Sequence, residues 1–102
     1  MSLVVHLRSG RGEVVADVVP PAGAGGFVAA AVDRDEYPLL RWVDPYSDTV
    51  FSQLQMRGLV PELERLERET TGDEHREVIR AVLGLAEQCA TRPHHQLVFI
   101  GD

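Results

Sequence analysis

The stretch Gln96-Leu97-Val98-Phe99-Ile100 decides which fold this sequence predicts. Successive side chains of a strand point to opposite faces of a sheet. The unbroken apolar run therefore places apolar groups on both faces of this segment, which is typical of a strand that is covered on both sides. Such a strand needs a neighbour on each side, so we expect it inside a sheet and not at its edge.

A hairpin near the start of the chain is expected to supply two more strands. Leu3–Leu7 is short, apolar and rich in β-branched residues, and residues 9–12 (Ser-Gly-Arg-Gly) are typical of a turn. Residues 14–19 are apolar on both faces except at Asp17. Apolar side chains on both faces favour a covered strand. Two prolines follow and end that strand, because proline cannot donate a hydrogen bond to a ladder.

The apolar segment Phe27–Val32 leaves two assignments open. Its alanines favour a helix, whereas the aromatic and β-branched residues at its ends favour the strand that we expect. Residues 44–47 (Asp-Pro-Tyr-Ser) match a type I turn, with aspartate at the first position and proline at the second. The residues that follow, Thr49–Gln53, predict another short strand.

A first helix is marked by leucines at helical spacing. Leu59, Leu63 and Leu66 recur at i, i+4 and i+7 and form one apolar stripe. Pro61 is tolerated only in the first turn of a helix, so we expect the helix to begin near residues 57–60.

A second helix follows a glycine at position 72. Residues 71–74 (Thr-Gly-Asp-Glu) predict a capping box at its start, and Pro93 closes it. Its apolar stripe consists of Val78, Val82, Leu85, Ala86 and Cys89. The stripe predicts that Cys89 is a buried and inert thiol.

Together these segments predict a single small α+β domain over residues 1–102. The expected architecture is a two-layer sandwich, in which two main helices pack on a four- or five-stranded, mainly antiparallel sheet. If the helices cover only one face of the sheet, a second subunit or the loop at residues 20–26 must cover the other. A homodimer is therefore one of the expected assemblies.

Composition and charge exclude several classes of protein. All ten basic residues are arginine, so no lysine is present for a Schiff base or a phosphate-binding loop. The single cysteine excludes an internal disulfide and a thiolate zinc cluster, and it fits a reducing cytoplasm. The net charge of −6 argues against nucleic-acid binding, which needs a basic surface. The longest apolar run has six residues, whereas a membrane helix needs about 20.

Three features suggest a cofactor or a metal, and each has a simpler interpretation. Residues 23–26 are glycine-rich but lack the G-x-G-x-x-G spacing, which favours a flexible connector. His94 and His95 are adjacent, so on a strand their side chains would point in opposite directions. Asp44 and Asp48 do not fit the calcium-loop pattern, and an Asx turn is the expected role of such an aspartate. We therefore predict no catalytic residue, no cofactor and no metal.

An aromatic and acidic segment at residues 37–51 is the best candidate for a recognition surface. It holds four of the six aromatic residues of the chain together with several acids. Aromatic and acidic groups on a stiff loop suit a basic protein partner. The competing interpretation is that Trp42, Tyr46 and Phe51 complete a core with few other large residues. The predicted partner-binding residues are Tyr37, Trp42, Asp44, Tyr46 and Asp48.

The same segment belongs to a longer pattern of residues. That pattern continues in Gln53-Leu54-Gln55-Met56, Glu62-Leu63-Glu64-Arg65-Leu66 and Phe99-Ile100-Gly101-Asp102. Over about the C-terminal two thirds of the chain it resembles a group of small uncharacterised bacterial proteins. The resemblance implies a soluble bacterial protein and brings no activity, cofactor or catalytic residue with it.

Two functions from different classes follow from these observations. The first is a small, acidic, non-catalytic module that binds a protein partner, as the net charge and the aromatic segment indicate. The second is a small ligand-binding domain or hydrolase-like enzyme in which Asp44 and Asp48 act with His94 or His95. The second function requires these side chains to reach one substrate.

Overall fold

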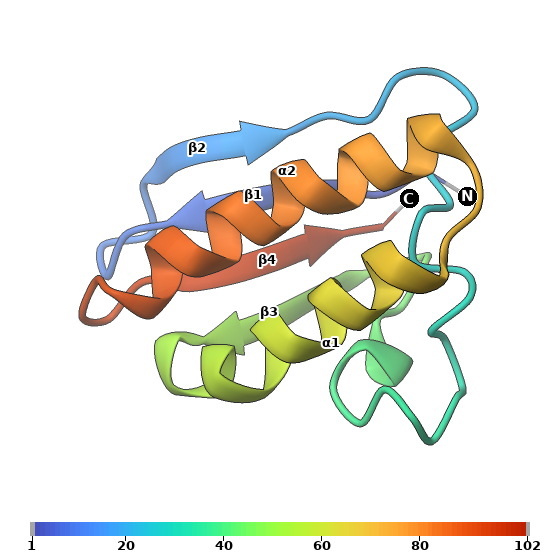
Figure 1. Ribbon diagram of the computed structural model, residues 1–102. Coiled ribbons are helices and arrows are strands. Elements are labelled where there is room, and N and C mark those ends of the chain that lie inside the picture. The colour runs from blue at the N-terminus through green and yellow to red at the C-terminus, as the bar shows by residue number, and fades with distance from the viewer. Residues whose placement is uncertain (1, 102) are drawn as a thin grey trace.

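The computed structural model describes residues 2–101 and contains one four-stranded antiparallel sheet (Figure 1). The strands lie in the order β2-β1-β4-β3, and every neighbouring pair is antiparallel. The last strand of the chain thus has a neighbour on each side, which confirms its predicted place inside the sheet. The strands are β1 (Val4–Arg8), β2 (Val14–Val18), β3 (Asp48–Ser52) and β4 (Gln96–Ile100).

Two helices form the second layer. α1 (Met56–Glu69) and α2 (Asp73–Ala90) run side by side over the same face of the sheet (Figure 1). Two short 3-10 turns, η1 (Leu40–Trp42) and η2 (Gln53–Gln55), lie on either side of β3. The predicted α+β class, with two main helices and a mainly antiparallel sheet, is confirmed.

The strand register assigns alternate residues to the two faces of the sheet. Val5 on β1 lies opposite Phe99 on β4, and both are buried in one core together with the apolar stripes of the helices. Val98, the neighbour of Phe99 along β4, points to the other face and takes no part in that core. Its partners across the sheet are His6 and Val50. Both α1 and α2 lie over the first face, so no helix of residues 2–101 covers the second one (Figure 1).

The start of α1 differs from the expected one. Proline in the first turn predicted a start near residues 57–60, but α1 begins at Met56 and Pro61 lies inside it. The reason is the preceding turn η2, where Ser52 and Gln55 form a capping box and the Ser52 N–H donates to Gln55 Oε1 over 2.8 Å. The chain already runs helically when it reaches Met56.

The predicted capping box at residues 71–74 is wrong. The N-cap of α2 is Gly72, which has no side chain, and no side-chain cap hydrogen bond is present. Thr71 lies one position too early to cap a helix that begins at Asp73. Asp73 and Glu74 are in the first turn, where their charges favour the positive end of the helix dipole.

The segment Phe27–Val32 is not a strand, so the sheet has four strands and not five. It forms a series of turns, in which the Ala31 N–H donates to the Val28 carbonyl oxygen over 2.9 Å. Three of its side chains join the core on the helix side, and so does Ala24 of the preceding loop. The small alanines permit this tight winding, which closes one end of the core.

β2 is an edge strand, although its two apolar faces predicted a covered one. The hairpin with β1 is confirmed, with His6 opposite Asp17 in the register. Asp17 is exposed, as an edge position allows. The pattern of β2 is the pattern of an interior strand, but no other strand of residues 2–101 pairs with its outer side.

Candidate functional site

The turn between η1 and β3 is built around the carboxylate of Asp44. Its Oδ1 accepts a 2.8 Å hydrogen bond from the Tyr46 N–H, and its Oδ2 accepts one of 2.8 Å from the Ser47 hydroxyl. The Asp44 N–H in turn donates to Thr49 Oγ1 over 3.0 Å. The expected Asx turn is confirmed. The Tyr46 N–H, and secondly the Ser47 hydroxyl, lower the pKa of the Asp44 carboxyl because they stabilise its charged form.

Trp42 and Tyr46 are exposed at the surface next to this turn. Trp42 is 68% exposed and Tyr46 is 76% exposed. The interpretation that they complete the core is therefore wrong for these two residues. It is right for Phe51, which is buried and packs edge-to-face on Phe99 with the ring centroids 5.6 Å apart.

Tyr37 does not belong to the recognition surface that the sequence predicted. It is fully buried, and its hydroxyl donates a hydrogen bond to Glu69 on α1. The guanidinium groups of Arg34 and Arg65 lie 5.8 and 5.6 Å from the centre of its ring. Burial, and secondly the hydrogen bond to Glu69, raise the pKa of Tyr37 to about 12. Tyr37 ties the segment to α1 and cannot contact a partner.

A buried carboxylate holds the segment in place just before Trp42. Glu62 of α1 is 7% exposed, and it accepts hydrogen bonds from the N–H groups of Leu39 (3.1 Å) and Leu40 (2.9 Å). These N–H groups open the turn η1, which carries Trp42 at its end. Glu62 thus acts as a cap supplied by another element. The sequence carries one signal of this role: Glu62 is a charged residue on the apolar stripe formed by the leucines of α1, so its carboxylate is expected on the buried side of the helix.

The charges around the exposed aromatic residues are mainly negative. Asp44 and Asp48 are both exposed, and neither forms an ion pair with any residue of the range 2–101. Arg41 is the nearest cation in the sequence, and its guanidinium lies 5.1 Å from the centre of the Trp42 ring. Its charge is already paired with Asp35 at 2.5 Å. The surface at Trp42, Asp44, Tyr46 and Asp48 is called the aromatic–acidic surface below.

The structure does not bring the proposed acid–base residues together. Asp48 pairs with Ile100 at one end of β4, and Ser52 pairs with Gln96 at the other end. Gln96 and Ile100 are about 13 Å apart along the strand, at about 3.3 Å per residue. His94 and His95 precede Gln96 and lie beyond that distance from Asp48. A general acid and a general base must reach one substrate, so these side chains do not form one catalytic site.

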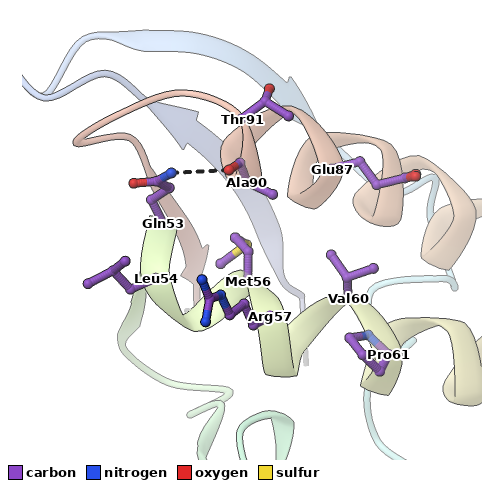
Figure 2. Close-up of a pocket in the computed structure, with 9 residues that line it drawn as sticks. All are labelled: Gln53, Leu54, Met56, Arg57, Val60, Pro61, Glu87, Ala90 and Thr91. Atoms are coloured by element: carbon purple, nitrogen blue, oxygen red, sulfur yellow. Dashed lines mark hydrogen bonds between the residues drawn. The ribbon is translucent and has the colours of Figure 1, made fainter.

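A hollow lies elsewhere, between the start of α1 and the end of α2 (Figure 2). Its volume is about 570 Å³, and its lining is mostly apolar. Gln53 closes one side, where its Nε2 donates to the Ala90 carbonyl oxygen over 3.1 Å. None of the predicted partner-binding residues lines this hollow, and neither does His94 or His95. Its lining residues are Gln53, Leu54, Met56, Arg57, Val60, Pro61, Glu87, Ala90 and Thr91.

Within residues 2–101, no group of three or more histidine, cysteine, aspartate or glutamate side chains could hold a metal ion. No helix in the same range combines the length and the apolar character that crossing a membrane requires.

Comparison with known proteins found no matching family model, no matching curated protein and no matching solved structure. The resemblance to small bacterial proteins therefore stays a prediction.

Proposed function

We propose that this protein is a small, acidic, non-catalytic module that binds a basic protein partner through its aromatic–acidic surface. The observation that carries the proposal is the exposure of Trp42 and Tyr46, which are 68% and 76% exposed. Tryptophan and tyrosine contribute most strongly when they become buried at the centre of an interface. Two such side chains within five residues supply the anchors of a binding surface.

The rigidity of the segment supports the same function. Glu62 and Tyr37 hold it to α1 on one side of Trp42, and the Asx turn of Asp44 holds it on the other. Anchors that are already ordered lose less conformational entropy on binding. The surface is thus organised before a partner arrives.

Charge supports a basic partner. The chain has a net charge of −6, and the two aspartates of the surface carry charges that no arginine of residues 2–101 neutralises in an ion pair. A field of this sign accelerates encounter with a positively charged protein and opposes encounter with nucleic acid. We place the protein in the bacterial cytoplasm, as its single free cysteine and its resemblance suggest.

The test is affinity capture from a lysate of the source cells at low and at high salt. The variant Trp42→Ala/Tyr46→Ala removes both anchors. Leu54→Ala is the matched control, because Leu54 is 77% exposed and lies at the other end of β3. We expect one stoichiometric partner that the wild type and the control retain at low salt. The double variant and high salt should both release it.

A second variant separates charge from local structure. Asp44→Asn/Asp48→Asn removes two negative charges, and the amide oxygen of the asparagine introduced at position 44 can still accept the hydrogen bond from the Tyr46 N–H that forms the turn. We expect a slower association rate with a weaker salt dependence and an unchanged fold. A partner that binds the double aromatic variant as tightly as the wild type would contradict the proposed surface. A lysate that yields no partner at either salt concentration would contradict the proposed function.

A further inference from the structure

Two charges of opposite sign lie on the facing walls of the hollow between α1 and α2 (Figure 2). Arg57 is the second residue of α1, and Glu87 lies near the end of α2. Both are exposed, and neither forms an ion pair with any residue of the range 2–101. Opposite charges that stay unpaired across a hollow suit a ligand with one negative and one positive end.

The rest of the hollow is mainly apolar. Its volume of about 570 Å³ falls within the range of small-molecule sites, about 300–1,000 Å³. Leu54 is 77% exposed, so its side chain has much apolar surface left to bury. These features suit a small ligand with an apolar body. The apolar lining residues are Leu54, Met56, Val60, Pro61 and Ala90.

Two polar side chains of the lining can accept hydrogen bonds from such a ligand. The contact between Gln53 Nε2 and the Ala90 carbonyl oxygen orients the Gln53 side chain and leaves its amide oxygen as an acceptor. The Thr91 hydroxyl donates to the Gln88 carbonyl oxygen over 3.1 Å and keeps its own acceptor lone pairs. An apolar ligand that also carries N–H groups and two charged ends has the chemistry of an apolar peptide.

The spacing of the two walls favours a short peptide over a free amino acid. Packed helices lie about 8–10 Å apart, axis to axis. One charge comes from each helix, so the two ends of the ligand must be separated by a similar distance. An extended tripeptide spans about 10 Å. A free amino acid carries both charges on one α-carbon and cannot reach both walls.

We propose that this hollow binds a short apolar peptide with free ends, with its carboxylate at Arg57 and its ammonium group at Glu87. A simple anion would meet the unpaired carboxylate of Glu87, and a simple cation would meet the unpaired guanidinium of Arg57. A zwitterionic peptide satisfies both charges. The site is separate from the aromatic–acidic surface, because no residue of that surface lines the hollow.

Matched peptides and protein variants test each charge by itself. The probe is the tripeptide Leu-Ala-Leu, used with free ends, N-acetylated, C-amidated or blocked at both ends. Arg57→Gln removes the proposed partner of the carboxylate, and Glu87→Gln removes that of the ammonium group. Arg68→Gln is the control, because Arg68 is exposed in the last turn of α1 and does not line the hollow.

The experiment is a titration of the isotope-labelled full chain, followed through its amide resonances in NMR spectra. We expect the free peptide to shift resonances of the hollow, among them the Gln53 side-chain amide and the Ala90 N–H. Blocking either end of the peptide, or introducing Arg57→Gln or Glu87→Gln, should weaken binding about tenfold. Amidation should cost nothing further in Arg57→Gln, and acetylation should cost nothing further in Glu87→Gln. Arg68→Gln should bind the peptide as the wild type does.

Three results would overturn the proposal. One is a free peptide that shifts no resonance up to its solubility limit. Another is a set of shifted resonances that lies away from the hollow. The third is equal binding of the free and the doubly blocked peptide, which would show that the charges take no part. The variant Trp42→Ala/Tyr46→Ala should bind the peptide like the wild type, so this proposal and the proposed function fail separately.

Discussion

The carboxylate of Glu62 on α1 accepts a 2.9 Å hydrogen bond from the backbone N–H of Leu40, the first residue of η1. The same carboxylate also accepts the N–H of Leu39. A buried charge is tolerated here because several donors satisfy it. This contact fixes the position of η1 on α1 and hence the display of Trp42.

Replacement of Glu62 is expected to destabilise the protein. Glu62→Ala leaves the N–H groups of Leu39 and Leu40 without a partner, and we expect the free energy of unfolding to fall by about 2–4 kcal/mol. Glu62→Gln keeps an acceptor oxygen, so its loss should be smaller. Urea denaturation followed by circular dichroism measures both. Glu64→Gln on the exposed side of α1 is the control, and an equal effect of Glu64→Gln would contradict the buried cap.

Stability should fall at alkaline pH through Tyr37. Its pKa in the folded protein is about 12, whereas the ordinary value is 10. The folded state therefore favours the neutral hydroxyl, and this contribution to stability is complete below pH 10 and is lost between pH 10 and 12. In a Tyr46→Phe background, Tyr37 is the only tyrosine, so its ultraviolet absorbance reports its ionisation alone. Ionisation near pH 10 in the folded protein would contradict this prediction.

Two glycines provide a pair of opposite predictions. A Cβ at Gly101 would lie 2.5 Å from the carbonyl oxygen of Pro45, so we expect Gly101→Ala to lower stability by about 1–3 kcal/mol and to displace the Asp44 turn. A Cβ at Gly84 meets nothing within 4 Å, and this position lies inside α2. Gly84→Ala should raise stability by about 0.5–1 kcal/mol. Thermal melting measures both, and a destabilising Gly84→Ala would refute the second prediction.

Cys89 is expected to react with thiol reagents only after unfolding. It is fully buried on α2, and burial raises the pKa of its thiol. Reaction with a disulfide reagent should therefore be slow in the native protein and should accelerate as urea unfolds it. A native reaction rate close to that of the unfolded chain would show that the thiol is accessible.

The regular elements could be predicted because their signals are local. The leucine spacing of α1 and the stripe of α2 require only the period of the helix. The two apolar faces of β4 predicted its interior place correctly. The same argument wrongly predicted a covered position for β2, which is an edge strand. Apolar residues on both faces favour burial, but they do not identify the element that would cover the strand.

The site could be predicted only in part. The segment that holds Trp42 and Tyr46 was identified from its composition, and the turn at Asp44 was predicted from residues 44–47 alone. The acid–base alternative with His94 and His95 required knowledge of strand direction, since the antiparallel register separates these histidines from Asp48. Register is a property of paired strands and has no signal within either one.

The three aromatic residues Tyr37, Trp42 and Tyr46 illustrate the same division. The sequence predicted all three as partner-binding residues, and it offered a place in the core as the competing interpretation for Trp42 and Tyr46. Tyr37 is buried where α1 supplies Glu69 for its hydroxyl and Arg65 for its ring, whereas the Trp42 ring lies against Arg41, its neighbour in the chain, and stays exposed. The hydrophobic periodicity of a helix or strand can be read from residues that are close in the sequence. The burial of a side chain depends on residues that become its neighbours only after the chain has folded.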